Sequence, residues 1–385
     1  MEKIKILNIV GTRPEAIKMA PLVQLLQRTA AVESILCLTA QHREMLDQVL
    51  SLFQLQADYD LDIMQKNQSL TYITAAALEK LEGVVAAEKP HLVLVQGDTT
   101  TTMAGSLAAF YHKIPVGHVE AGLRTGDRYA PFPEEINRRI NSVIAALHFA
   151  PTAEARRNLL REGFAEEGIF VTGNTVIDAL HTTVQKEFRF PHPQLNSLDF
   201  QHRRILLVET HRRENLGAPM ESICLALLDL LQAFPDVSIV FPVHRNPAVR
   251  EVVYRHLADH PRALLLDPLD PLSFHNLMDR AYFVLTDSGG IQEEAPALGK
   301  PVLVLRRVTE RPEALEAGTA LLVGTARESI VGQARRLLEN PAAYRAMSRA
   351  ANPYGDGQAS RRILQIILHY FKAAAALPEP FEPGP

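Results

Sequence analysis

The strongest constraint on the fold is an alternation of short apolar runs with helix-length amphipathic segments. Residues 4–10 and 91–96 are largely apolar, and a segment with helical spacing follows the first of them at residues 16–28. Apolar strands separated by helices are typical of a parallel sheet that helices cover on both faces. The pattern therefore predicts an α/β protein whose functional residues lie in the loops directly after the strands.

The alternation breaks once and then restarts. Residues 188–204 contain two prolines and no helical period, which indicates a linker. We expect a Rossmann-like doubly wound domain at residues 1–187 and a second one at 205–357, followed by a helix at 358–376. Four prolines fall within residues 377–385, which predicts a flexible tail.

Charge and composition exclude several classes of partner. The net charge is −4, so no nucleic acid is expected, and no apolar run is long enough to span a bilayer. The two cysteines, Cys37 and Cys224, are too far apart for a CxxC metal site. They favour a reducing, cytoplasmic setting.

Charged side chains follow the strands of the first domain. Arg13 and Lys18 stand at a helix start, where an anion can bind. Asp98, Glu120 and Glu134 come from successive loops, and we expect them to converge. Each has a simpler interpretation as a cap, an ion-pair partner or a first-turn acid. Together they suit proton transfer or a metal site, but no HxH or HExxH spacing supports a metal.

The loops of the second domain carry basic side chains and glycines that leave backbone N–H groups accessible. A Ser-Gly-Gly sequence before a helix lets N–H groups approach a phosphate, and a glutamate one turn later is placed for sugar hydroxyls. Histidines and arginines follow neighbouring strands. These loops predict a bound nucleotide diphosphate, through His211, Arg212, His244, Ser288, Gly289, Gly290, Glu294 and Arg311.

Several blocks, in order, resemble the non-hydrolysing UDP-N-acetylglucosamine 2-epimerases. They run from residue 11 to about residue 357 and include GTRPEAIKMAP (11–21), VQGDTTTTMAGSLAAFY (95–111), GHVEAGLRTGDRYAPFPEEINRR (117–139), THRRENLG (210–217) and TDSGGIQEEAPALGKPVLVLR (286–306). Any single block is weak, whereas the ordered combination is highly specific.

The resemblance implies a glycosyltransferase-B-like fold: two Rossmann-like domains, UDP-sugar in the inter-domain cleft, and a C-terminal helix that crosses back to the first domain. It implies interconversion of UDP-GlcNAc and UDP-ManNAc through 2-acetamidoglucal, for bacterial surface polysaccharides. It further implies a homodimer, no metal and no cofactor.

The resemblance also implies roles for individual residues. Asp98, Glu120 and Glu134 match the family's catalytic carboxylates, with acid and base left open, and His211 matches a histidine that acts on the departing UDP. Phe274 matches a position near the uracil. The other substrate-contacting positions are Arg13, Lys18, His244, Ser288, Gly289, Gly290, Glu294 and Arg311.

A second UDP-GlcNAc acts as an effector in many bacterial members of this family. Gln41, His42, Arg43 and Arg212 keep that neighbourhood. However, Asn67 stands where many members have arginine, and Glu44 where some have glutamine. Ala146, Arg307 and Val308 are further departures. We expect weakened or altered effector binding.

Three rival functions stay open on the sequence alone. A hydrolysing 2-epimerase would start with the same elimination but release UDP and ManNAc; the intact 117–139 block speaks against it. A glycosyltransferase would need an acceptor groove, and the carboxylate trio argues against that. A catalytically dead UDP-sugar sensor is disfavoured by the presence of Asp98, Glu120, Glu134 and His211.

Overall fold

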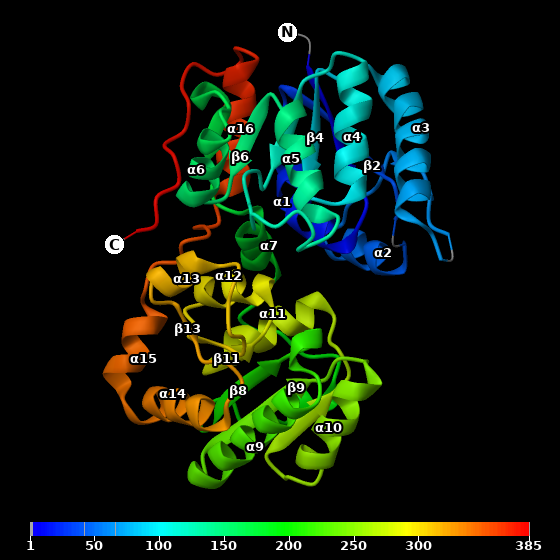
Figure 1. Ribbon diagram of the computed structural model, residues 1–385. Helices are drawn as coiled ribbons and strands as arrows, with labels where there is room; N and C mark the ends of the chain where they lie inside the picture. The colour runs from blue at the N-terminus through cyan, green and yellow to red at the C-terminus, as the bar shows by residue number, and fades with distance from the viewer. Residues whose placement is uncertain (1–2, 42, 66, 385) are drawn as a thin grey trace. The chain divides into compact units, whose positions relative to one another are not determined.

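The computed structural model describes residues 3–41, 43–65 and 67–384. The chain divides into two compact units (Figure 1). Unit 1 comprises residues 1–181 and 354–382, and unit 2 comprises residues 182–353 with the last residues of the chain. The boundary between them falls in the last turn of helix α7 (Thr175–Thr183).

Unit 1 is built on a parallel sheet, which has seven strands among the described residues in the order β3-β2-β1-β4-β5-β6-β7. The strands are β1 (Ile4–Val10), β2 (Val32–Leu38), β3 (Tyr59–Asp60), β4 (Leu92–Gln96), β5 (Val116–Val119), β6 (Leu147–Ala150) and β7 (Ile169–Val171).

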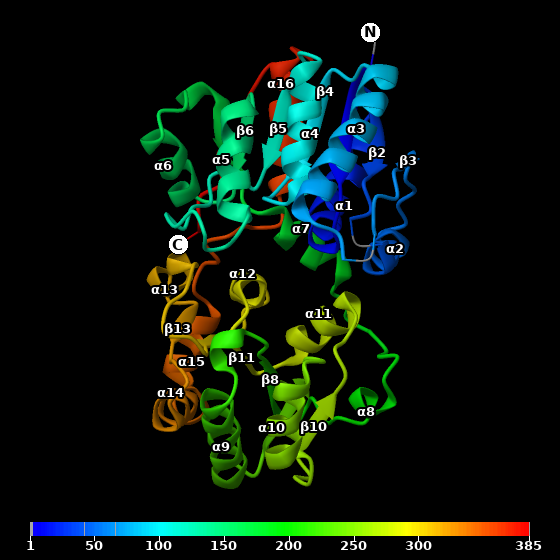
Figure 2. The same ribbon diagram turned by 45° about the vertical axis from the view of Figure 1, so that its right-hand side comes forward.

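Helices cover both faces of this sheet. Ile6 and Val10 of β1 pack in a core with α1, α2 and α16, whereas Leu7 and Ile9 pack in the opposite core with α3 and α4. Figure 2 shows α3 and α4 side by side. The helices are α1 (Arg13–Gln27), α2 (Arg43–Leu52), α3 (Leu70–Glu88), α4 (Thr100–Tyr111), α5 (Glu134–Ile144), α6 (Ala153–Arg161), the 3₁₀ turn η1 (Glu166–Gly168) and α16 (Ala359–Tyr370).

The C-terminal segment belongs to unit 1. Helix α16 packs against α1, and the buried carboxylate of Asp178 accepts hydrogen bonds from the first N–H groups of α16, at Ala359 (3.2 Å) and Ser360 (2.8 Å). The residues after α16 differ from the flexible tail that the prolines suggest. Phe381 is 4% exposed, and its N–H donates to the carbonyl of Val171 at 2.8 Å. One buried aromatic ring thus anchors a proline-rich segment.

Unit 2 repeats the architecture with a parallel sheet, six-stranded within the described part of the chain, in the order β10-β9-β8-β11-β12-β13. Its strands are β8 (Arg204–Glu209), β9 (Val237–Pro242), β10 (Ala263–Leu266), β11 (Phe283–Thr286), β12 (Val302–Val304) and β13 (Ala320–Leu322). Its helices are α8 (Pro193–Asn196), η2 (Arg213–Asn215, 3₁₀), α9 (Ala218–Ala233), α10 (Pro247–Leu257), α11 (Pro271–Arg280), α12 (Gly289–Ala297), α13 (Pro312–Glu316), α14 (Arg327–Glu339) and α15 (Pro341–Ser348).

The predicted fold class, two doubly wound parallel sheets, is confirmed. In both sheets the strand order reverses beside the first strand of the unit, between β1 and β4 and between β8 and β11. Ligands of such sheets bind at the carboxyl ends of the strands next to this reversal. The loops after these four strands are therefore the places to look for function.

Candidate active site

In unit 1, a buried carboxylate joins the loops after β1 and β4. Glu15 is 1% exposed and accepts hydrogen bonds from the Thr99 hydroxyl (2.8 Å), the Thr102 hydroxyl (3.1 Å) and the N–H of Gly11 (3.3 Å). Burial raises the pKa of Glu15. Thr99 also caps α4, and Thr101 bonds Thr39. The threonine run therefore fixes two loops to each other as well as starting a helix.

Glu120 is a tightly held carboxylate at this edge of the sheet. It directly follows β5 with φ +67°, a conformation that side chains other than glycine rarely adopt. Its side chain accepts from the Lys18 ammonium (2.5 Å), the Gln96 amide (2.5 Å) and the Asn174 amide (2.9 Å). Three donors from different elements hold one buried carboxylate in a single position.

Asp98 is more open to solvent than Glu120. A Cβ placed on Gly97, the residue before Asp98, would lie 3.6 Å from Glu120 Oε2. The Asp98 carboxylate is 26% exposed and pairs with Arg138 of α5 at 2.7 Å. The Glu120 carboxylate thus approaches the backbone of the loop that carries Asp98, and the convergence of the two carboxylates stays a prediction.

The loop from Glu120 to α5 carries the third carboxylate. Glu135, which is fully buried, accepts from the N–H groups of Thr125 (3.1 Å) and Gly126 (3.3 Å) and so ties the loop to the helix. Glu134 begins α5, one turn before Arg138. Its Oε2 is buried and has no hydrogen-bond partner within the described residues. Glu134 therefore shares a helix face with the arginine that holds Asp98.

The two predicted cations of unit 1 differ in their surroundings. Arg13 is half-buried at the start of α1, and the described part of the chain offers it no ion-pair partner. Lys18, in contrast, pairs with Glu120.

A buried histidine supports the loop that carries Asp98. His118 bonds the carbonyl of Gly97 at 2.7 Å, and burial lowers the pKa of His118 to about 4. This histidine is neutral and supports the backbone under Asp98.

In unit 2, one buried aspartate shapes the loop after β8. Asp287 is fully buried and accepts from the Thr210 hydroxyl, the Asn215 amide (2.8 Å) and the backbone N–H groups of His211 (3.1 Å) and Arg212 (3.0 Å). Asp287 follows β11 and Thr210 follows β8. The carboxylate therefore fastens the two strand ends at the reversal of the sheet.

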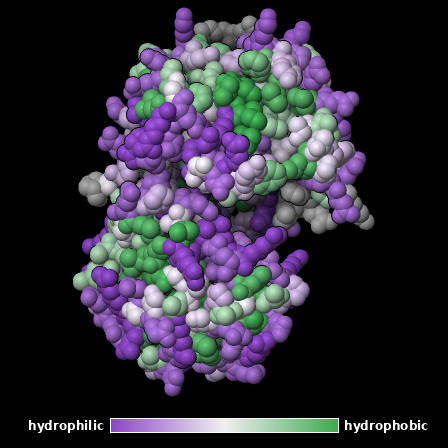
Figure 3. Space-filling model, viewed as in Figure 1, coloured by the Kyte–Doolittle hydropathy of each residue, from purple (hydrophilic) through white to green (hydrophobic). Residues whose placement is uncertain are grey.

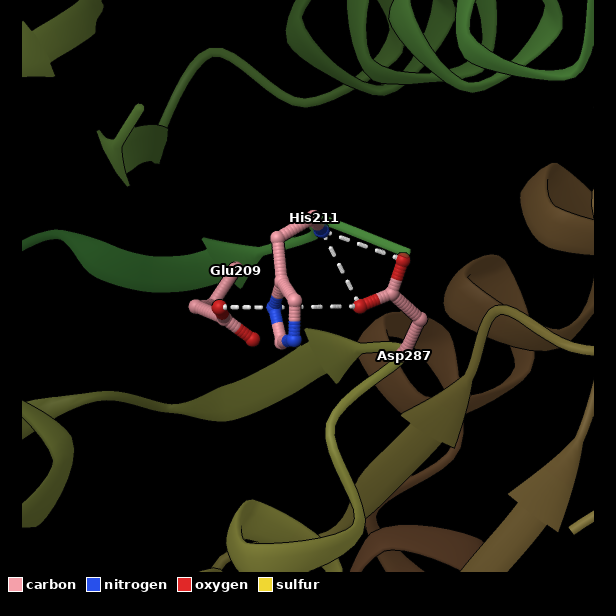
Figure 4. Close-up of side chains that lie close together, drawn as sticks. All are labelled: Glu209, His211 and Asp287. Atoms are coloured by element: carbon pink, nitrogen blue, oxygen red, sulfur yellow. Dashed lines mark hydrogen bonds and ion pairs between the residues drawn. The ribbon is translucent and has the colours of Figure 1, made fainter. Parts of the chain in front are cut away.

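His211 projects from this fastened loop. Its Nδ1 lies 2.6 Å from Glu209 Oε1 and 3.6 Å from Asp287 Oδ1 (Figure 4). Its ring stacks on that of His244 at 5.8 Å between centroids. The hydrogen bond to Glu209 raises the pKa of His211. His211 and His244, both predicted to contact the ligand, are thus adjacent.

The Glu209, His211 and Asp287 side chains lie close enough to enclose a metal ion. However, the Asp287 oxygens already receive hydroxyl, amide and backbone donors, and Glu209 Oε2 receives the Thr286 hydroxyl at 3.0 Å. Both carboxylates are therefore surrounded by N–H and O–H donors, as in a hydrogen-bonded loop, rather than directed at a shared cation. We therefore interpret the group as a histidine oriented by two carboxylates.

The Ser-Gly-Gly loop begins α12, with Ser288 as the residue before the helix. A Cβ added to Gly289 or Gly290 would meet no protein atom within 3.8 Å, and the nearest atoms at 3.9 Å are side-chain atoms of Arg212, Glu310 and Glu294. Protein packing therefore does not demand glycine at either position. Close approach of a ligand to the backbone is a sufficient reason for both.

The remaining predicted ligand-binding residues of unit 2 have protein partners. Glu294 Oε2 lies 3.7 Å from His275 Nε2, and Arg311 pairs with Glu293 at 2.5 Å. Arg212 contacts Glu310 at 3.4 Å. Phe274 is half-buried on α11.

The predicted effector residues are only partly described. The Gln41 side chain accepts from Thr101 at 3.2 Å, and its carbonyl accepts from Gln68 at 3.1 Å. Asn67, next to Gln68, is exposed. His42 and the side chain of Arg43 lie outside the described residues.

Sequence reasoning missed the side chains that hold the candidate catalytic groups. Gln96 and Glu209 are each the last residue of an otherwise mainly apolar strand, a signal that was available. Asn174 and Arg138 lie inside longer sequence blocks in which nothing marks them individually, and the sequence indicated no role for Asp287.

Comparison with known proteins decides the family. A family model described as UDP-N-acetylglucosamine 2-epimerase matches residues 24–368. The chain belongs to the UDP-N-acetylglucosamine 2-epimerase family. It is 53% identical to the enzyme of that name from Bacillus subtilis over 99% of each chain, and 55% identical to the one from Salmonella typhimurium over 95% of this chain and 99% of the relative.

Solved structures of this family agree. The UDP-GlcNAc 2-epimerase from Neisseria meningitidis, bound to UDP-GlcNAc, matches with a TM-score of 0.85 and 49% identity over 95% of this chain and 100% of that chain. The enzyme from Methanocaldococcus jannaschii, in complex with UDP-GlcNAc and UDP, matches with a TM-score of 0.77 and 34% identity over 95% and 99%. Within the described residues, no helix has the length and apolar character needed to cross a bilayer.

Proposed function

We propose that this family member is a non-hydrolysing epimerase that interconverts UDP-GlcNAc and UDP-ManNAc. A carboxylate of unit 1 takes the proton from C2, the C1–O bond breaks with its electron pair leaving on UDP, and a C1–C2 double bond forms. Return of a proton to the opposite face of C2, with UDP adding back at C1, completes the epimerisation. Asp98, Glu120 and Glu134 are the candidates for these transfers.

The observation that carries the proposal is the pair of carboxylates after β4 and β5. Glu120 is held by three donors, whereas the Asp98 carboxylate, on the loop after the neighbouring strand, is partly open. Two carboxylates in such different environments suit two different proton-transfer roles. Glu134, with its unpartnered buried oxygen, is the third candidate.

Unit 2 supplies the proposed binding site for UDP. The start of α12 offers backbone N–H groups at Ser288–Gly290 with the positive end of the helix behind them. His211 and Arg212 add positive charge beside this loop. Glu294 is assigned to the ribose hydroxyls and Phe274 to the uracil, with Arg13 and Arg311 as further substrate contacts. No cofactor enters the scheme.

Retention of UDP separates this proposal from hydrolysis. The chain keeps the whole 117–139 block, and Glu135 fastens its loop through Thr125 and Gly126. An ordered loop over the intermediate would favour re-addition of UDP over attack by water.

The deciding experiment is incubation with UDP-GlcNAc in deuterated water, followed by NMR. We expect UDP-ManNAc with deuterium at C2 and no net release of UDP. Stoichiometric free UDP and ManNAc would establish hydrolysis instead. Absence of exchange without an acceptor would favour a glycosyltransferase.

We further propose a homodimer that acts in the cytoplasm for surface polysaccharide synthesis. Phe110, Tyr111 and Val143 are 58%, 66% and 75% exposed on α4 and α5. Figure 3 shows hydrophobic side chains gathered on this face of unit 1. Exposed apolar patches mark interaction surfaces. Sedimentation of the wild type and of a Phe110→Ser/Tyr111→Ser variant tests this: the variant should be monomeric.

A further inference from the structure

Glu209 is held in place more firmly than a surface carboxylate. It ends β8, where one oxygen lies 2.6 Å from His211 Nδ1 and the other accepts from the Thr286 hydroxyl at 3.0 Å. Thr286 ends the neighbouring strand β11. Both oxygens of Glu209 are therefore directed by the sheet edge, and one of them faces the imidazole.

The charged groups around His211 come from three strand ends. Glu209 follows from β8, Asp287 from the loop after β11, and His244 from the loop after β9, while Arg212 is the next residue in the chain. Near Nδ1, the two negative charges of Glu209 and Asp287 outnumber the one positive charge of Arg212. The balance favours the imidazolium form, and the resulting rise in the pKa of His211 comes first from the Glu209 hydrogen bond, opposed by burial and Arg212.

The free edge of the ring is Nε2. Within the described residues the hydrogen bonds of the His211 ring all involve Nδ1, and His244 stacks on its face. With Nδ1–H given to Glu209, a protonated ring has one remaining donor, Nε2–H.

We infer that Glu209 is a positioning residue that fixes the His211 ring through Nδ1 and holds it as the imidazolium, so that Nε2–H donates to the diphosphate as the C1–O bond breaks. The inference rests on the proposed function. No net proton is consumed, because the electron pair leaves with UDP and the hydrogen bond stabilises the added charge. Asp287 shapes the loop through backbone N–H groups, whereas Glu209 sets the state of the ring.

Two measurements on Glu209→Gln test the inference. Glutamine keeps the size and an acceptor for Nδ1–H but removes the negative charge. We expect the midpoint of the His211 NMR titration to fall by about one pH unit, as for loss of a neighbouring carboxylate. The alkaline limb of the kcat–pH profile should move to lower pH by the same amount. As a result, kcat at high pH should fall about tenfold, while KM changes little.

Matched variants separate charge from position and from general damage. Glu221→Gln removes a surface glutamate of α9 that pairs with Arg255 and should leave both profiles unchanged. Glu209→Asp keeps the charge but withdraws it by one methylene, so kcat should fall at every pH without a large change in the titration. It also serves if Glu209→Gln does not fold.

An unchanged His211 titration in Glu209→Gln would overturn the inference, as would an unshifted alkaline limb in an active variant. If the wild type does not convert UDP-GlcNAc, the proposed function fails. The NMR titration needs no activity, and it then still decides whether Glu209 holds the imidazolium.

Discussion

The Lys18 ammonium lies 2.5 Å from Glu120 Oε1, and the two side chains are 21% and 6% exposed. Lys18 stays a predicted substrate contact, and in this structure its ammonium also neutralises a buried carboxylate. Since Gln96 and Asn174 bond the same carboxylate, Lys18 is part of the frame that positions Glu120.

Removing this cation should be costly. Lys18→Met leaves Glu120 buried with amide donors only, and loss of one partner of a buried pair strongly destabilises a protein. We expect the free energy of unfolding to fall by about 2–3 kcal/mol, together with a loss of turnover. Urea denaturation and initial rates measure the two effects.

The double variant Lys18→Met/Glu120→Gln is the control for this pair. Glutamine needs no counter-charge, so stability should recover relative to Lys18→Met while activity stays lost. Equal instability of the single and double variants would show that the pair does not couple.

Asp98→Asn should separate catalysis from folding. Asparagine keeps an oxygen for Arg138 but cannot take a proton, so turnover should fall by about 10²–10⁴-fold with an unchanged unfolding transition. Asp259→Asn, at an exposed position, is the matched control and should retain activity. Near-full activity of Asp98→Asn would remove Asp98 from the mechanism. His211→Ala should also lose orders of magnitude in turnover.

Substrate-saturation curves test the effector hypothesis. Asn67 places a neutral, exposed side chain beside Gln68, which contacts Gln41. The family resemblance implies an arginine in place of Asn67 in many members. A weaker attraction for a second UDP-GlcNAc should give near-hyperbolic kinetics. Strong sigmoidality would contradict the hypothesis, and Asn67→Arg should increase cooperativity if it is right.

The sequence predicts the sheets well because each strand is a short run buried on both faces. The apolar run at 4–10 matches β1, and the run at 91–96 matches β4 to within one residue. The two-residue strand β3 was missed, because Tyr59–Asp60 is too short to show a pattern and exists only by pairing with β2. The expected linker contains the short helix α8.

The site shows the same division. Residues that follow strands, such as Asp98 and His211, could be placed from the sequence because parallel strands end at one edge. Their partners could not, since a hydrogen bond such as that from Asn174 to Glu120 joins positions 54 residues apart. The buried Phe381 was also beyond reach, because nearby prolines dominate the local pattern.

Two buried histidines of unit 1 should make stability fall in acid. Burial lowers the pKa of His118 and His148 to about 4, below the ordinary histidine value of 6.5. The unfolded chain therefore binds more protons between these values, so stability is full above pH 6.5 and is lost as the pH falls toward 4. Each histidine can contribute about 1.4 kcal/mol per pH unit in this window.

His148→Phe checks this sign. It removes the titrating group at a site that packs against the Phe164 ring, so unfolding free energies between pH 7 and 4.5 should fall less steeply than in the wild type. An equal slope would mean that His148 already titrates normally in the folded protein.

Gly290→Ala should damage ligand binding but not the fold. The added methyl would lie 3.9 Å from the nearest side-chain atom, so the unliganded protein has room for it. A bound diphosphate would lose that room, and we expect the affinity for UDP, measured by calorimetry, to fall by about 1–3 kcal/mol, the cost of overpacking a tight contact. Gly332→Ala, on α14 with nothing within 4 Å, is the matched control and should bind UDP normally with equal or slightly higher stability. Wild-type UDP affinity in Gly290→Ala would show that the diphosphate does not approach this backbone.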